Sequence, residues 1–126
     1  MRSEPIFRQI VDGLAAAGIP YVVVGSLAAN AYGIVRSTLD VDIVVETQPG
    51  HIAALMAALG SEFELEPQMS FETVTGTQKR LIRDRASEFV IELFHLSSEP
   101  HDQERFARRR QISILDRQVW VLWLIP

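Results

Sequence analysis

The two stretches Val24-Gly25-Ser26 and Asp40-Val41-Asp42 decide how this chain folds and where its chemistry would lie. The first ends an apolar run that starts at Tyr21, and the second opens another apolar run that reaches Glu46. Both runs are rich in β-branched residues and have the length of a strand. We therefore expect two buried strands, the first ending at a glycine and the second carrying acids.

Gly25 and Ser26 are suited to binding phosphate. The segment that follows them, residues 26–32, is short and alanine-rich, and we expect a helix there that ends at Gly33. A glycine lets a phosphate approach the backbone, a helix N-terminus offers unpaired N–H groups, and the serine hydroxyl adds a donor. The same pair also serves as a plain strand-to-helix turn with a serine cap, and the two roles are compatible.

Asp40 and Asp42 are two residues apart on an extended segment, so their side chains are expected to point the same way. Neighbouring carboxylates repel each other, and a divalent cation is the usual reason to place them together. Such a cation can bridge the phosphates of a nucleotide during phosphoryl transfer. The alternative is a pair of solvent-exposed acids, but the upstream Gly25-Ser26 pair favours a site for Mg²⁺ or Mn²⁺ and a nucleoside triphosphate.

The rest of the chain alternates helical and extended patterns, which indicates an α/β (α+β) fold with a mixed central sheet flanked by helices. Helices are expected from a start at Ser3 and Pro5 to a stop at Gly18, over residues 51–59, and from Pro100 to the arginines at 108–110. Further strands are expected over residues 63–65, 71–74, 80–82, 89–94, 112–115 and 119–125, with turns at 75–77 and at Asp116-Arg117. The length of 126 residues predicts a single domain over 1–126.

This pattern resembles the Gly-Gly/Ser … Asp-x-Asp signature of the polymerase-β-like nucleotidyltransferase superfamily. More narrowly, it looks like the bacterial minimal nucleotidyltransferases related to abortive-infection toxins, in which a glycine and an arginine precede Ser/Thr-x-Asp-x-Asp. The residues that carry the resemblance are Val24-Gly25-Ser26-Leu27-Ala28 and Tyr32-Gly33-Ile34-Val35-Arg36-Ser37-Thr38-Leu39-Asp40-Val41-Asp42.

The resemblance extends to later parts of the chain. Glu92, in the middle of an apolar run, stands where a third acid is expected, although relatives usually have aspartate there. Phe106 followed by Arg109 and Arg110, and then a closing strand, also matches. Relatives usually continue with a helical region, so we expect a catalytic domain that lacks that region.

The resemblance also implies roles for individual residues. The nucleotide would be bound by Gly25, Ser26 and Arg36. Catalysis and metal binding would be carried by Asp40, Asp42 and Glu92. For Glu92 the alternative is a strand residue that faces solvent, because its neighbours Ile91 and Leu93 would point to the other face.

The amino-acid composition excludes several kinds of site and partner. A net charge of −4 gives no overall attraction to nucleic acid, and the absence of cysteine excludes disulfides, thiolate metal sites and a cysteine nucleophile. Lys79 is the only lysine among the basic residues. The sequence shows no export signal and no apolar run of membrane-spanning length, which predicts a cytoplasmic protein without membrane contact.

Together these patterns predict a Mg-dependent nucleotidyltransferase that moves a nucleoside monophosphate from ATP or another triphosphate to a hydroxyl. The acceptor could be a tRNA, a partner protein or a small molecule, and the resemblance points to a toxin–antitoxin or phage-defence system. The alternative is a non-catalytic remnant of the fold that acts as an interaction or antitoxin-like module. A partner protein or a second copy would then contact the apolar strand over residues 119–125.

Overall fold

A computed structural model describes residues 3–24, 40–66, 70–72, 77–87 and 89–121. The helices are α1 (Ser3–Ala17), α3 (His51–Leu59) and α4 (Pro100–Ala107). The strands are β1 (Tyr21–Val24), β2 (Asp40–Val45), β3 (Phe63–Leu65), β4 (Ser70–Glu72), β5 (Thr77–Asp84), β6 (Val90–His95), β7 (Arg110–Ile114) and β8 (Arg117–Val121). None of the helices among the described residues is long and apolar enough to cross a membrane.

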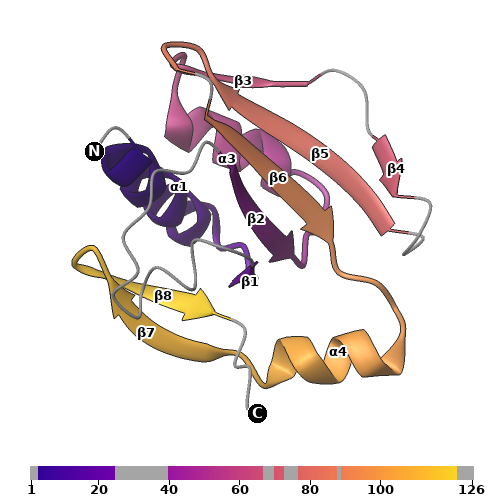
Figure 1. Ribbon diagram of the computed structural model, residues 1–126. Helices are drawn as coiled ribbons and strands as arrows, with labels where there is room; N and C mark the ends of the chain where they lie inside the picture. Colours follow the sequence, from indigo (N-terminus) through magenta and orange to yellow (C-terminus); the bar gives the residue numbers. More distant parts are fainter. Residues whose placement is uncertain (1–2, 25–39, 67–69, 73–76, 88, 122–126) are drawn as a thin grey trace.

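The strands form one mixed sheet in the order β3-β5-β6-β2-β1-β8-β7, with β4 paired to β5 outside this path (Figure 1). β2 lies between β1, which is antiparallel to it, and β6, which is parallel to it. The parallel β2–β6 pair requires a long connection, and α3 together with β3 to β5 supplies it. The acid-bearing strand β2 is therefore central in the sheet.

The core lies on one face of the sheet, beneath α1 and α3. Side chains alternate along β2 and β6, so that Ile43, Ile91 and Leu93 are fully buried among helix residues such as Leu14 and Leu55. The sequence predicts a mostly apolar strand both for β2 and for β6. The alternation between buried and outward-facing residues explains why each of these strands can carry an acid. Residues of opposite parity point away from the helices.

The two helices that cover the core pack closely because of a glycine in α1. A Cβ at Gly13 would lie 3.1 Å from Leu55 Cδ1 and 3.1 Å from Leu59 Cδ2 of α3. The absence of a side chain there brings the helix backbones together and lets the leucines fill the space. α1 then ends at Ala17, and Gly18, with a φ of 71°, turns the chain before Pro20 leads into β1.

The expected mixed sheet flanked by helices is confirmed, and most elements lie where the sequence predicts them. The strand expected over residues 80–82 is longer, because β5 runs from Thr77 to Asp84 beside both β6 and β4. The helix expected to end in the arginines at 108–110 stops at Ala107, and Arg110 already belongs to β7. Arg110 pairs with Val121 of β8, and this pairing sets the boundary between α4 and β7. Helix propensity cannot predict such a boundary, because it takes no account of pairing with a distant strand.

The hairpin turn between β7 and β8 lies one residue earlier than expected. Leu115 and Asp116 have φ of 49° and 65°, the left-handed pair of a two-residue hairpin turn. The sequence gives little sign of this, because leucine rarely adopts that conformation. Arg8 of α1 donates a hydrogen bond of 3.0 Å to the Leu115 carbonyl, and Arg117 forms a two-pronged contact with Asp12, so α1 fixes the hairpin.

Candidate functional site

The structure describes part of the expected site. Gly25, Ser26 and Arg36 lie outside the described residues, as does the helix expected over residues 26–32. Asp40 opens β2, where the structure describes its backbone and leaves its side chain undescribed. Asp42 and Glu92 are described in full, and the geometry of the candidate site therefore rests on these two acids.

Asp42 and Glu92 are directly opposite each other on neighbouring strands. β2 and β6 run parallel, and their register aligns Asp40 with Val90 and Asp42 with Glu92. Residues aligned in this way project from the same face of a sheet, on strands that are about 4.8 Å apart. Both acids are half-buried, and both point away from the core that α1 and α3 cover.

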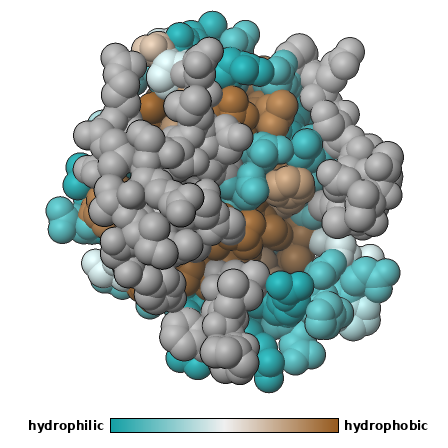
Figure 2. Space-filling model, in the orientation of Figure 1, coloured by the Kyte–Doolittle hydropathy of each residue, from teal (hydrophilic) through white to brown (hydrophobic). Residues whose placement is uncertain are grey.

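The surface around these acids is partly apolar. Val44 and Phe94 follow Asp42 and Glu92 on the same face and are half-buried. Figure 2 shows hydrophobic surface in the middle of one view of the molecule, in the region where Figure 1 draws β2 and β6. Carboxylates in such surroundings lose part of their hydration, so their mutual repulsion is stronger than it would be in open water.

Lys79 of β5 supplies a positive charge at this point. Its Nζ lies 3.1 Å from Glu92 Oε1, and the two side chains are 23% and 24% exposed. The same ammonium lies 5.8 Å from the centroid of the Phe94 ring. Lys79 therefore offsets the charge of one of the two neighbouring acids and restrains the direction of its carboxylate.

The sequence did not lead us to Lys79 as a site residue. Its only distinction there is that it is the single lysine of the chain. Its position opposite Phe94, two pairs along from the register of Leu81 with Glu92, depends on how β5 pairs with β6. A hairpin register of this kind could suggest Lys79 only after the strand boundaries are known.

The donor set of this site fits a hard divalent cation. Asp42 and Glu92 offer oxygen ligands from adjacent strands, and oxygen is what Mg²⁺ prefers. Among the side chains that the structure describes, no group of three histidines or acids gathers closely enough to hold a metal. Asp40 is the position on β2 from which a third carboxylate would come, two residues before Asp42 on the same strand face.

His95 lies on the opposite face from Glu92, as its position in the strand predicts. Its Nδ1 lies 3.0 Å from the Thr47 hydroxyl oxygen, which ties the end of β6 to the segment after β2. Burial lowers the pKa of His95 from its ordinary value, and the charge of Arg80 lowers it further. This histidine therefore has a structural role at the strand end, away from the paired acids.

Comparisons with known proteins bear on this arrangement. No protein-family model and no curated protein matches the chain. Among solved structures, a protein described as a "putative nucleotidyltransferase from H. pylori" is similar with a TM-score of 0.50 at 18% identity, over 93% of this chain and 51% of that one. A second structure, JHP933 from Helicobacter pylori, has a TM-score of 0.48 at 17% identity, over 93% of this chain and 50% of that one.

The likeness to the first of these structures shows that the chain has a nucleotidyltransferase-like fold. The chain spans about half the length of both H. pylori proteins. At this level of identity the shared feature is the arrangement of helices and strands, so arguments about chemistry must come from the residues of this chain.

Proposed function

We propose that this chain is a Mg-dependent nucleotidyltransferase of the minimal or abortive-infection toxin type. The observation that supports the proposal is the alignment of Asp42 with Glu92 on adjacent parallel strands, on the face opposite the core. Like charges on directly opposite residues of neighbouring strands are destabilising, and a bound cation would remove that cost.

In this proposal the phosphates of a nucleoside triphosphate lie against Gly25, Ser26 and Arg36. Asp40, Asp42 and Glu92 hold Mg²⁺ or Mn²⁺, which when bound neutralises phosphate charge and orients the reacting groups. The acceptor hydroxyl oxygen forms a bond to the α-phosphorus while the bond to the bridging oxygen of pyrophosphate breaks. The hydroxyl proton passes to the Glu92 carboxylate, and no covalent enzyme intermediate is needed.

The acceptor class follows from the resemblance and from the charge of the chain. The net charge of −4 provides no general attraction to RNA, so a tRNA end would have to be recognised locally. A hydroxyl of a partner protein or of a small molecule needs no such attraction. We propose an intracellular role in a toxin–antitoxin or phage-defence system, with a tRNA end or a protein hydroxyl as the acceptor.

Transfer of label tests this function. The chain is incubated with Mg²⁺, each α-labelled nucleoside triphosphate and cell extract, and the products are separated into protein, RNA and small molecules. We expect one labelled product class, and a decrease in its formation by about 100-fold or more in Asp42→Asn and in Glu92→Gln.

A matched control is Glu64→Gln, which removes an exposed acid from β3 and should leave labelling unchanged. Labelling that survives in Asp42→Asn would contradict the assignment of the acids. Absence of labelled product with every triphosphate would contradict the reaction itself.

One observation favours a second candidate function, a non-catalytic interaction module. The Lys79–Glu92 ion pair already neutralises one of the acids, which would suit a protein that no longer binds a metal there. The expected contact strand over residues 119–125 is described only to Val121, and Val119 and Val121 lie in the core. Melting temperatures measured with and without Mg²⁺ and triphosphate separate the two functions, because only specific binding raises them.

A further inference from the structure

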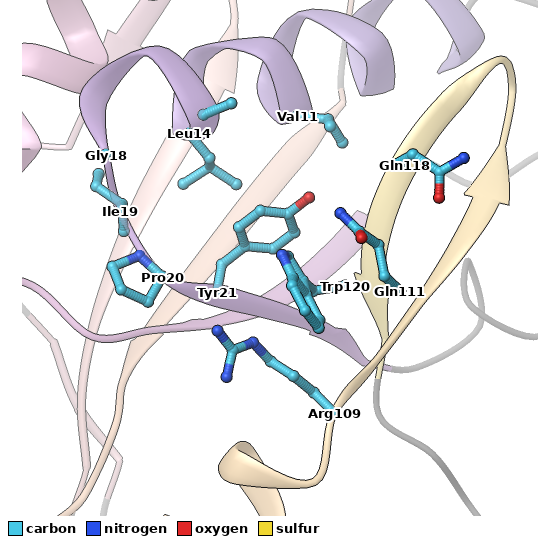
Figure 3. Close-up of a pocket in the computed structure, with 11 residues that line it drawn as sticks. Val11, Leu14, Gly18, Ile19, Pro20, Tyr21, Arg109, Gln111, Gln118 and Trp120 are labelled. Atoms are coloured by element: carbon cyan, nitrogen blue, oxygen red, sulfur yellow. The ribbon is translucent and has the colours of Figure 1, made fainter.

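A cavity lies at the other end of β1 from the paired acids. Asp42 is aligned with Val24 at the end of β1. The cavity surrounds Tyr21 at the start of β1, and the partner of Tyr21 in β2 is Val45. The cavity measures about 290 Å³ and lies between α1 and the β7–β8 hairpin. Figure 3 shows α1 on one side of it and the two hairpin strands on the other.

The walls of this cavity combine an apolar side with a polar side. α1 contributes Val11 and Leu14, while the hairpin contributes Trp120 and the amides of Gln111 and Gln118. Gln111 and Trp120 are direct partners across the hairpin. Tyr21 lies between the two walls, with its ring beside Trp120 and its hydroxyl directed toward Gln111 (Figure 3). A ligand that fits here needs an apolar body and a polar end.

Arg109 provides the charge of the cavity. Its guanidinium carbon lies 4.5 Å from the centroid of the Trp120 ring and 4.3 Å from that of the Phe106 ring, so two aromatic rings hold it in place. Stacking against rings occupies the faces of a guanidinium and leaves its edge of N–H donors available for a planar anion.

The hydrogen bonds of Arg109 are incompletely satisfied within the described part of the chain. Nη1 donates to the Phe106 carbonyl at 3.1 Å, but Nε is buried and has no hydrogen-bond partner there. None of the ion pairs that the described residues form includes Arg109. Burial lowers the pKa of Arg109, and the negative charge of Glu46 opposes that effect. A desolvated cation in this state is stabilised by an incoming anion.

The surroundings select the kind of anion. Among the described residues that line the cavity, only Arg109 carries a guanidinium, and the negative charges of Glu46 and Asp12 act on Arg109 and on Tyr21 respectively. A singly charged group is therefore favoured over a phosphate dianion. Burial raises the pKa of Tyr21, so its hydroxyl remains neutral and can donate a hydrogen bond. The volume suits a body the size of one aromatic ring system.

We propose that this cavity binds a small carboxylate carried on an apolar or aromatic body, with the carboxylate on the edge of Arg109 and the body against Trp120 and the hairpin glutamines. The site is separate from the paired acids of β2 and β6 and does not depend on the function proposed for them. Binding there would act on the junction of α1 with the β7–β8 hairpin.

Binding of indole-3-acetate, followed by NMR in the absence of nucleotide and metal, tests the proposal. We expect saturable shifts of the side-chain N–H signals of Trp120, Gln111 and Gln118, with a Kd of about 1 mM or tighter. Indole-3-acetamide has the same shape without the charge and should bind at least about tenfold more weakly. Equal binding of acid and amide, or shifts confined to other residues, would overturn the proposal.

Variants separate the role of Arg109 from general charge. Arg109→Lys keeps the charge and loses the planar fork, so we expect affinity to decrease by about tenfold while the protein remains folded. Arg108→Met removes the exposed neighbouring arginine, which pairs with Glu104, and should leave affinity unchanged. Unchanged affinity in Arg109→Lys would overturn the carboxylate assignment. If a peptide with a C-terminal tryptophan bound ten times more tightly than indole-3-acetate, the cavity would be a site for a polypeptide C-terminus, and the small-molecule assignment would be overturned.

Discussion

At the scale of single residues, the ion pair between Lys79 and Glu92 joins two charged side chains that are largely buried. Lys79→Met leaves Glu92 beside Asp42 without its counter-charge, and we expect the free energy of unfolding to fall by on the order of 1–2 kcal/mol. The double variant Lys79→Met/Glu92→Gln should recover part of that loss, because the repulsion is then removed. Urea denaturation of the two single variants and the double variant measures the coupling.

The exposed ion pair between Arg83 and Glu66 is a control for the effect of burial on the stability that an ion pair contributes. Its atoms are closer, at 2.7 Å, but the side chains are 45% and 38% exposed. Arg83→Met should therefore cost less than about 1 kcal/mol despite the shorter distance. Equal losses in Lys79→Met and Arg83→Met would contradict the view that partial burial makes the Lys79–Glu92 pair matter.

His95 predicts a dependence of stability on pH. Because its pKa is lowered in the folded state, the unfolded chain binds the proton more tightly. The stabilisation that neutral His95 provides is complete above the unfolded value of about 6.5, and it is lost as the pH falls through the lowered folded pKa. Denaturation midpoints at several pH values should show that His95→Asn has a smaller loss below pH ~6.5 than the unmodified chain. An identical loss in both proteins would contradict this origin.

At the scale of elements, the contact between α1 and α3 depends on Gly13. Gly13→Leu would force a side chain against Leu55 and Leu59, and we expect a loss of about 1–3 kcal/mol in the free energy of unfolding. Ala16→Leu places the same side chain on an exposed position of the same helix and should change stability little. Comparable stability of Gly13→Leu and Ala16→Leu in thermal unfolding would mean that the helices do not pack as described.

The elements also show what the sequence could and could not reveal. Helix α3 was predicted with the correct bounds because the preceding Pro49, the apolar spacing and the following Gly60 all agree there. The strand β5 was underestimated because its polar and basic residues, such as Lys79 and Arg80, obscure the alternation. Its length is set by pairing with β6, which is information about another part of the chain.

The same distinction applies to the candidate site. Asp42 and Glu92 could be proposed from sequence, since an acid within an apolar strand is unusual unless it faces solvent or a site. Their alignment, however, depends on the parallel pairing of β2 with β6, about fifty residues apart in sequence. Lys79 and the cavity around Arg109 were not predicted, because each results from the approach of elements distant in the chain.

At the scale of the whole molecule, one core joins α1, α3 and the sheet, and the face opposite that core holds the acids. Stability therefore comes from one face of the sheet, and the proposed chemistry belongs to the other. We propose that the Asp42–Glu92 pair, together with Asp40, forms a site for a divalent cation beside a triphosphate.

Paramagnetic broadening by Mn²⁺ tests this proposed cation site. The amide signals of the chain are recorded while Mn²⁺ is added in the presence of a non-hydrolysable nucleoside triphosphate. We expect selective broadening of the amide signals of Asp42, Glu92 and their neighbours on β2 and β6, and this broadening should be lost in Asp42→Asn and retained in Glu64→Gln. Broadening centred elsewhere, or unchanged in Asp42→Asn, would contradict it.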